Sequence, residues 1–101
     1  MTASAIVASY KLSQAADEDL DRLFDHGIDR FGLDQAIEYW DGLNRRFSEL
    51  AETPQQWQAV EYIRSGYRRS VYGSHSIYYR IEADEIVVVR ILGQENPDTA
   101  F

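Results

Sequence analysis

The 101-residue sequence contains no cysteine, one lysine, one methionine and only two prolines. The absence of cysteine excludes disulfide scaffolds, cysteine-ligated zinc sites and thiol nucleophiles. No apolar run approaches the ~20 residues that a membrane-spanning helix needs, and the start of the chain lacks the basic residues of a secretory signal. We therefore expect a single cytoplasmic domain over residues 1–101 without a membrane partner, since one domain commonly has roughly 100–150 residues.

The chain is acidic, with a formal net charge of −7. Residues 1–54 hold 11 acidic and 5 basic side chains, whereas residues 55–101 hold 6 and 5. Such a chain lacks the broad positive field that drives general binding to nucleic acids. We expect no direct sequence-specific binding to nucleic acid, although Arg64, Arg68 and Arg69 form a local basic cluster.

Apolar residues recur with a helical period in the first half of the chain. Ser13 is a suitable N-cap for the first helix, and Gly32 is placed to end it. The second helix follows with Asp34 as its cap and ends at Thr53-Pro54. Because the link is so short, the two helices are predicted to form an antiparallel hairpin over about residues 14–52. Their apolar stripes are Ala16, Leu20, Leu23, Phe24, Gly27 and Phe31, then Ala36, Trp40, Leu43, Phe47 and Leu50.

The second half is rich in tyrosine, valine and isoleucine, which favour strands. Residues 67–72, 76–82 and 85–92 are separated by turn-length links, so they predict an antiparallel meander within about residues 67–92. The predicted fold is α+β, with the element order β-α-α-β-β-β. An antiparallel sheet is covered on one face by the N-terminal helical hairpin.

The sequence also indicates the structure of three further segments. A short strand at Val7–Leu12 is expected to add to one edge of the sheet. Residues 53–66 are interpreted as a loop. Residues 93–101 are interpreted as a loose tail, because Asn96-Pro97-Asp98 interrupts regular structure.

The residue types that commonly carry catalysis form no recognised pattern here. His26 and His75 belong to different elements, and the sequence has neither a nucleophile elbow nor a phosphate-cradling glycine loop. Asp17, Asp21 and Asp25 line one helical face, which we interpret as a solvated face rather than a metal site. We predict no catalytic residue, no metal and no cofactor.

The segment Arg64–Arg69 is the densest positive stretch of the chain. Arg68 and Arg69 point to opposite faces of a strand. Two hypotheses stay open: these arginines pair with the acidic helices, or they meet carboxylates of a partner, to which bidentate arginine contacts are suited. Tyr78 and Tyr79 also divide between the faces, and we expect one in the core and the other partly exposed as a binding anchor.

Several short motifs of the second half stand in a characteristic order. They are Gly66-Tyr67-Arg68-Arg69, Gly73-Ser74-His75, Ile77-Tyr78-Tyr79-Arg80 and Arg90-Ile91-Leu92. In this order they resemble the C-terminal half of ParE toxins, which belong to the RelE/ParE superfamily. The first half is similar as well, at Leu12-Ser13, Asp19-Leu20, Phe31-Gly32 and Thr53-Pro54. The resemblance covers about residues 10–92.

The resemblance implies the toxin of a bacterial type II toxin–antitoxin system. ParE toxins inhibit DNA gyrase by binding and are neutralised by ParD-like antitoxins, so it implies a non-enzymatic toxin in a hetero-oligomer with its antitoxin. A disordered antitoxin segment folds over the toxin and lays a helix along residues 14–52. For contact with gyrase or the antitoxin we predict Arg64, Arg68, Arg69, His75, Tyr78 and Arg80. For the antitoxin groove we predict Leu23, Tyr39 and Trp40.

Two alternatives remain. RelE-type relatives cleave messenger RNA on the ribosome, and here His75, Arg68 and Arg90 are the candidate residues for such an endoribonuclease. The loop 53–63 has no lysine or arginine, which argues against that activity. The other alternative is a non-toxic antitoxin-binding module, because residues 93–98 replace a histidine and a basic residue that many ParE sequences carry after the last strand.

Overall fold

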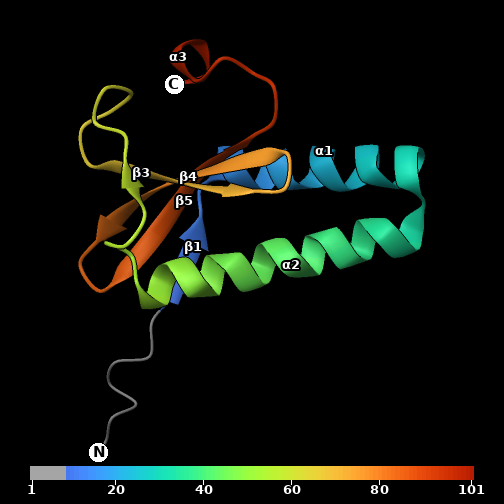
Figure 1. Cartoon of the computed structure of the whole chain (residues 1–101), viewed down its shortest axis with the longest axis horizontal. Helices are drawn as coiled ribbons and strands as arrows, with labels where there is room; N and C mark the ends of the chain where they lie inside the picture. Colours follow the sequence, from blue (N-terminus) through green and yellow to red (C-terminus); the bar gives the residue numbers. More distant parts are fainter. Residues whose placement is uncertain (1–8) are drawn as a thin grey trace, which may run out of the picture.

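The computed structural model describes residues 9–101, so residues 7 and 8 of the predicted first strand lie outside the described part. A hairpin of two long helices lies along one face of a five-stranded sheet (Figure 1). This arrangement confirms the predicted fold class and element order. The elements are β1 (Ser9–Leu12), α1 (Gln14–Phe31), α2 (Leu33–Glu52), β2 (Gln58–Ala59), β3 (Tyr67–Tyr72), β4 (His75–Glu82), β5 (Glu85–Leu92) and α3 (Pro97–Ala100).

The helix ends follow from local chemistry with one exception. Ser13 caps α1 as predicted, because its Oγ accepts a hydrogen bond from the Ala16 amide at 3.0 Å. Gly32 ends α1 with φ +93°, a region that favours glycine. The prediction that Asp34 caps α2 is wrong. The helix begins at Leu33, and Gly32 occupies the cap position without a side-chain bond.

The strand order across the sheet is β1-β5-β4-β3-β2. Strands β3, β4 and β5 form the predicted antiparallel meander, and β1 adds to the edge as expected. It runs parallel to β5, however, from Ser9 opposite Glu85 to Leu12 opposite Val88, whereas the sheet was predicted to be antiparallel throughout. No tight turn joins β1 to β5, so the long connection through the helices allows the parallel direction.

A β-bulge divides β5. Tyr78 is opposite Arg90 and Tyr79 is opposite Val88, which leaves Val89 as the extra residue. The bulge changes the alternation of side chains along the strand. Before it, Val88 faces the helices, and after it Ile91 does so, although the two are three residues apart.

Both faces of the sheet are covered. The core under the helices contains Leu43, Phe47, Ile77 and Tyr79. On the opposite face, which we call the far face, the second cluster consists of Val60, Tyr78, Val87, Val89 and Leu92, with Ile63, Tyr67, Ala100 and Phe101 packed against it. The far face is therefore covered by the segment before β3 and by the C-terminal residues.

This cover corrects three predictions. Residues 93–101 are not a loose tail, because Pro97 starts α3 and Asn96 caps it by accepting from the Asp98 amide at 2.9 Å. Proline is tolerated in the first turn of a helix, where its missing N–H has no partner in any case. Tyr78 and Tyr79 are both buried, so neither is the partly exposed anchor we expected. The predicted loop 53–66 also contains β2, a two-residue strand at the sheet edge.

Candidate protein-docking site

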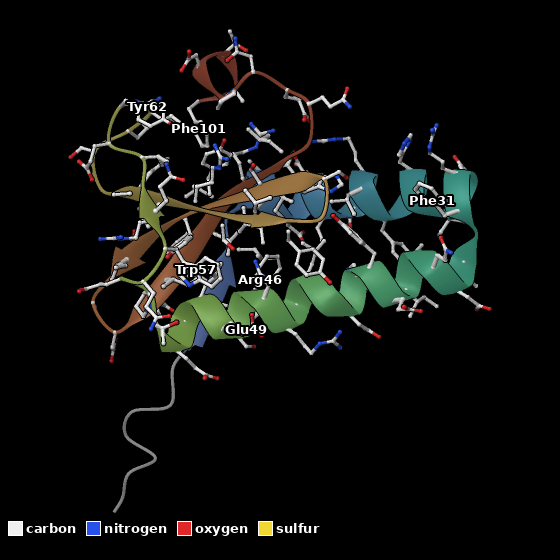
Figure 2. All side chains as sticks on the ribbon, in the orientation of Figure 1. Phe31, Arg46, Glu49, Trp57, Tyr62 and Phe101 are labelled. Atoms are coloured by element: carbon white, nitrogen blue, oxygen red, sulfur yellow. The ribbon has the colours of Figure 1, made fainter. Side chains whose placement is uncertain are left out.

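The end of the helical hairpin extends beyond the sheet (Figure 1) and carries exposed apolar side chains, among them Phe31 (Figure 2). Four large ones have between 39% and 61% of their surface exposed, and we call them the hairpin patch: Phe31, Leu33, Ile37 and Trp40. The ring of Phe24 in α1 packs edge to face against Trp40, at a ring-centroid distance of 6.4 Å. An exposed apolar cluster of this kind typically marks a protein–protein contact.

The hairpin patch has a helical spacing and an acidic border on one side. Leu33, Ile37 and Trp40 follow at offsets of four and three residues, so they form one stripe along α2. Asp34 and Asp41 are exposed beside this stripe on the same helix. The surface therefore suits an amphipathic helix with an apolar face and basic residues on the flank that meets Asp34 and Asp41.

The three residues predicted for an antitoxin groove lie on different surfaces. Leu23 lines a hollow of about 180 Å³ together with His26 and His75. Tyr39 lines a separate hollow of about 320 Å³ beside Tyr72. Trp40 belongs to the hairpin patch and lines neither hollow, so one shared groove is not formed by these side chains.

Tyr39 joins α2 to the turn between β3 and β4. Its hydroxyl donates to the Tyr72 carbonyl at 2.9 Å and lies 2.8 Å from Nδ1 of His75. A hydroxyl has one proton, so Nδ1 of His75 must donate to the Tyr39 oxygen. The other ring nitrogen, Nε2, is then the acceptor of the neutral imidazole.

Burial shifts the pKa values of both Tyr39 and His75. It lowers the pKa of His75 below 6.5, an effect that nearby Glu95 opposes and His26 reinforces. Burial also raises the pKa of Tyr39 above 10. Both groups are therefore neutral near pH 7, and their hydrogen bond holds the turn against the helix.

The predicted arginines separate onto different surfaces. Arg68 faces the helix side and donates to the carbonyls of Gln55 and Trp57, at 3.3 and 2.6 Å. Its guanidinium thus holds the loop before β3, not an acidic helix as one hypothesis had it. Arg64 is exposed in that loop, while Arg69 is on the opposite side of β3 from Arg68.

Sequence reasoning missed Arg46, which ties α2 to β3. Its guanidinium lies over the rings of Trp57 and Tyr72, at 4.9 and 5.2 Å from the ring centroids (Figure 2). Nη1 donates to Ser70 Oγ at 2.8 Å and to the Val71 carbonyl at 2.9 Å. The neighbouring Arg45 is exposed, and nothing in the sequence distinguishes the two arginines.

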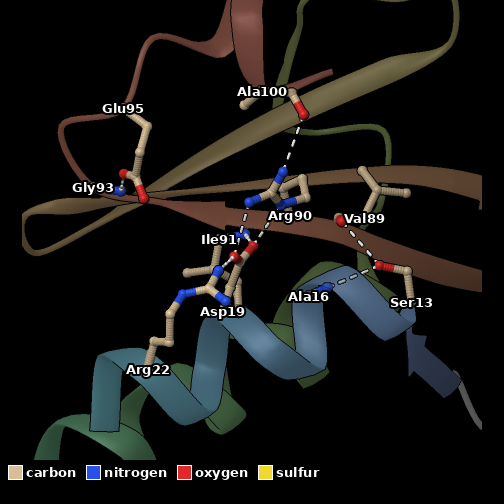
Figure 3. A network of polar contacts seen from close by, with 10 residues as sticks. All are labelled: Ser13, Ala16, Asp19, Arg22, Val89, Arg90, Ile91, Gly93, Glu95 and Ala100. Atoms are coloured by element: carbon tan, nitrogen blue, oxygen red, sulfur yellow. Dashed lines mark hydrogen bonds and ion pairs between the residues drawn. The ribbon is translucent and has the colours of Figure 1, made fainter. Parts of the chain in front are cut away.

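A second missed element is the buried carboxylate of Asp19, which is only 3% exposed. Figure 3 shows how it joins α1 to β5: Arg90 donates to both carboxylate oxygens, at 2.7 and 2.9 Å, and the Ile91 amide donates at 2.9 Å. Arg22 makes a further ion pair from the surface. In the sequence this aspartate stood out only as part of the motif Asp19-Leu20.

This network closes an open strand edge. The pairing of β1 with β5 ends at Val88, and beyond that point the start of α1 takes its place. Ser13 Oγ donates to the Val89 carbonyl at 2.9 Å, and Asp19 accepts from Ile91. Backbone groups that would otherwise lie unpaired at the edge are thus satisfied.

The candidate nuclease residues are engaged separately. His75 bonds to Tyr39, Arg68 holds loop carbonyls, and Arg90 is held by Asp19. Within residues 9–101 no three histidine, aspartate or glutamate side chains are grouped so that they could hold a metal ion. No helix of that range is long and apolar enough to span a membrane.

The two-helix hairpin on this five-stranded sheet has counterparts among solved structures. The ParDE toxin–antitoxin system from P. aeruginosa contains a chain of the same fold, with a TM-score of 0.74, 23% identity, and coverage of 88% of this chain and 98% of that one. In the RelBE2 toxin–antitoxin complex from Mycobacterium tuberculosis the TM-score is 0.60 at 17% identity, covering 90% and 95%.

Sequence comparison gives the family. The family model described as the ParE toxin of the type II toxin–antitoxin system parDE matches residues 10–97. Toxin ParE1 of Caulobacter vibrioides is 36% identical over 85 residues, and Toxin ParE1 of Mycobacterium tuberculosis is 38% identical over 86. Each alignment covers 84% of this chain and 88% of the relative. This chain belongs to the ParE toxin family of type II toxin–antitoxin systems, which confirms the resemblance.

Proposed function

We propose that this toxin inhibits DNA gyrase by binding to it, and that a ParD-like antitoxin neutralises the toxin by covering the hairpin patch. Both steps take place in the cytoplasm, and the neutralised form is a hetero-oligomer. The observation that carries the proposal is the exposed apolar stripe on α2, from Leu33 to Trp40, in a chain of the ParE family.

The chemistry of the hairpin patch fits an antitoxin segment. Full burial of one large apolar side chain contributes about 1.5–3 kcal/mol, and four of them are available. Because these four side chains are already partly buried, docking gains only part of that free energy for each, which offsets the roughly 2–5 kcal/mol that a segment loses in ordering when it folds on binding. Exposed Asp34 and Asp41 add charge complementarity to a basic helix.

The arrangement of the polar residues supports action by binding, without catalysis. Ribonuclease chemistry needs an acid or base and cationic groups gathered around one phosphate. Here His75, Arg68 and Arg90 have separate structural partners. The toxin would therefore act by stabilising a state of gyrase.

A supercoiling assay with purified gyrase tests the target. Adding the protein should reduce supercoiling of relaxed plasmid and leave DNA broken after denaturation of gyrase, while messenger RNA in a parallel translation reaction stays intact. Cleaved transcripts with unchanged supercoiling would instead identify a ribonuclease. No effect in either assay would indicate the non-toxic binding module.

Antitoxin binding is tested with matched aromatic truncations. Trp40→Ala removes part of the hairpin patch, whereas Tyr62→Ala removes an aromatic ring that is 73% exposed on the loop before β3. We expect Trp40→Ala to weaken binding of the antitoxin by at least about tenfold, as an interface anchor does, and Tyr62→Ala to leave it unchanged. Equal affinities of the two variants would contradict the proposed docking surface.

A further inference from the structure

The far face of the sheet carries arginine and tyrosine side chains in alternating positions. Tyr67 of β3 is opposite Arg80 of β4, and Arg69 is opposite Tyr78, which is itself opposite Arg90 of β5. Directly paired residues of antiparallel strands project from the same face. We call these five residues the arginine–tyrosine face. It gathers three of the predicted partner residues, Arg69, Tyr78 and Arg80, which the sequence could not place together.

Three guanidinium groups are concentrated here although the chain has a net charge of −7. Two of them have anionic partners, since Arg80 pairs with Glu82 and Arg90 pairs with Asp19. The Nε of Arg69 is buried, and none of the described residues accepts its proton. A buried donor without an acceptor costs about 1–3 kcal/mol, so this position favours a ligand that brings an acceptor.

The C-terminal residues show what chemistry this face accepts. Phe101 meets both tyrosines edge to face, at centroid distances of 5.4 Å from Tyr67 and 5.2 Å from Tyr78. The carbonyl of Ala100 accepts from Nη1 of Arg90 at 3.0 Å (Figure 3). The occupant thus supplies an aromatic ring and an oxygen acceptor.

Apart from the packing of Ala100 and Phe101, the C-terminal segment is held to the sheet by few hydrogen bonds. No residue of α3 is buried. Within the described part of the chain, the bond between Arg90 and Ala100 is the one hydrogen bond from residues 96–101 to the sheet. The backbone bonds of Thr99 and Ala100 both return to Asn96. Segments with so few anchors open locally at low free energy.

We infer that the arginine–tyrosine face is a second docking site, for an acidic peptide segment that carries an aromatic side chain. Residues 96–101 occupy this site within the same chain and must leave before a partner binds. This part of the chain has the chemistry of the ligand itself, because Asp98 and Phe101 lie within the segment and Glu95 directly precedes it. The site lies on the face of the sheet opposite the helical hairpin, so a partner there and a partner on the hairpin patch can be bound together.

Displacement of the segment can be measured with full-length variants. The probe is a fluorescent peptide with the sequence of residues 94–101, and its binding is followed by anisotropy. Phe101→Ala should bind the peptide at least about tenfold more tightly than the wild type, because the competing ring is gone. Phe31→Ala removes an exposed phenylalanine from the hairpin patch and should bind like the wild type.

Two further measurements test which chemical groups the site recognises. A peptide with alanine in place of its phenylalanine should lose binding to Phe101→Ala, and adding Arg69→Gln to that variant should weaken binding of the original peptide. Failure of Phe101→Ala to bind the peptide, with its near-UV circular dichroism retained, overturns the inference. Tighter binding of a single-stranded RNA oligonucleotide than of the peptide also overturns it, by assigning the face to nucleic acid.

Hydrogen exchange of the wild type gives a test that does not depend on folding of a variant. The amides of residues 99–101 should exchange at least about a hundredfold faster than the Ile91 amide, which Asp19 holds. Exchange of both regions at the same rate would show that the segment is a fixed part of the domain and would refute its displacement.

Discussion

Asp19 and Arg90 form an ion pair 71 positions apart in sequence, with Nε of the partly buried Arg90 at 2.7 Å from the buried carboxylate. The same carboxylate accepts from the Ile91 amide, and the same guanidinium donates to the Ala100 carbonyl. One pair therefore connects α1, the edge of β5 and the C-terminal segment. Its removal should affect the stability of the whole domain.

We predict that Asp19→Ala lowers the free energy of unfolding by about 3–5 kcal/mol, because it leaves the Arg90 charge without its partner. This is a large part of the roughly 5–15 kcal/mol that stabilises a typical domain. Urea denaturation followed by circular dichroism measures the change. Asp21→Ala alters an exposed aspartate of the same helix and should change stability by less than about 0.5 kcal/mol. Similar losses in both variants would contradict a special role for Asp19.

Replacing either of two helical glycines by alanine is expected to change the stability of the protein, but in opposite directions. A Cβ on Gly27 would lie 3.5 Å from the Ala36 Cβ, an ordinary contact. Gly27→Ala should therefore stabilise the protein by up to about 1 kcal/mol through helix propensity. A Cβ on Gly42 would overlap the Tyr72 hydroxyl oxygen, and the Tyr72 ring is packed against Tyr39 and Arg46. Gly42→Ala should destabilise the protein by roughly 1–2 kcal/mol in the same urea assay, because overpacking exceeds the gain in propensity.

The stability of the protein should depend on pH through His75. Burial places its pKa in the folded protein below the ordinary value of 6.5, so the unfolded chain binds a proton first as the pH falls. The contribution of the neutral imidazole is complete above pH 6.5 and is lost as the pH falls from 6.5 through the lower folded pKa.

The comparison of wild type with His75→Asn isolates this effect. Between pH 7.5 and pH 5 the wild type should lose more stability than the variant, because asparagine does not titrate in this range. The carboxylates of the chain change the free energy of unfolding equally in both proteins, so the difference between the two curves removes their contribution. Parallel curves over the whole range would show that His75 is not titrating in a buried site.

Local patterns predicted a large part of the fold. The Ser13 cap, Gly32 and the apolar stripes determine where the first helix starts and ends, because these signals act within a few residues. The turn-length links around Gly73 and Ala83 determine the meander, since short connections leave adjacent strands little choice but to pair. The order of motifs then indicated the family, which the comparisons confirmed.

The sequence predicted several residues of the two candidate docking surfaces, but not which surface each residue would join. Arg69, Tyr78 and Arg80 were selected together with Arg68 and others, but a strand's alternation sends Arg68 to the helix side and Arg69 to the far face. Trp40 was selected for its size, and the structure leaves it partly exposed. The spacing of residues along the sequence does not indicate which face of the sheet or of the helical hairpin another segment will cover.

The sequence by itself determined the helical hairpin, the meander and the family, because periodicity, caps and turns are properties of neighbouring residues. Only the tertiary structure decided the parallel pairing of β1, the burial of Tyr78 under Phe101 and the ion pair of Asp19 with Arg90. Each of these joins residues that are far apart along the chain. Their contact depends on how the complete elements pack, and no local pattern of residues records that packing.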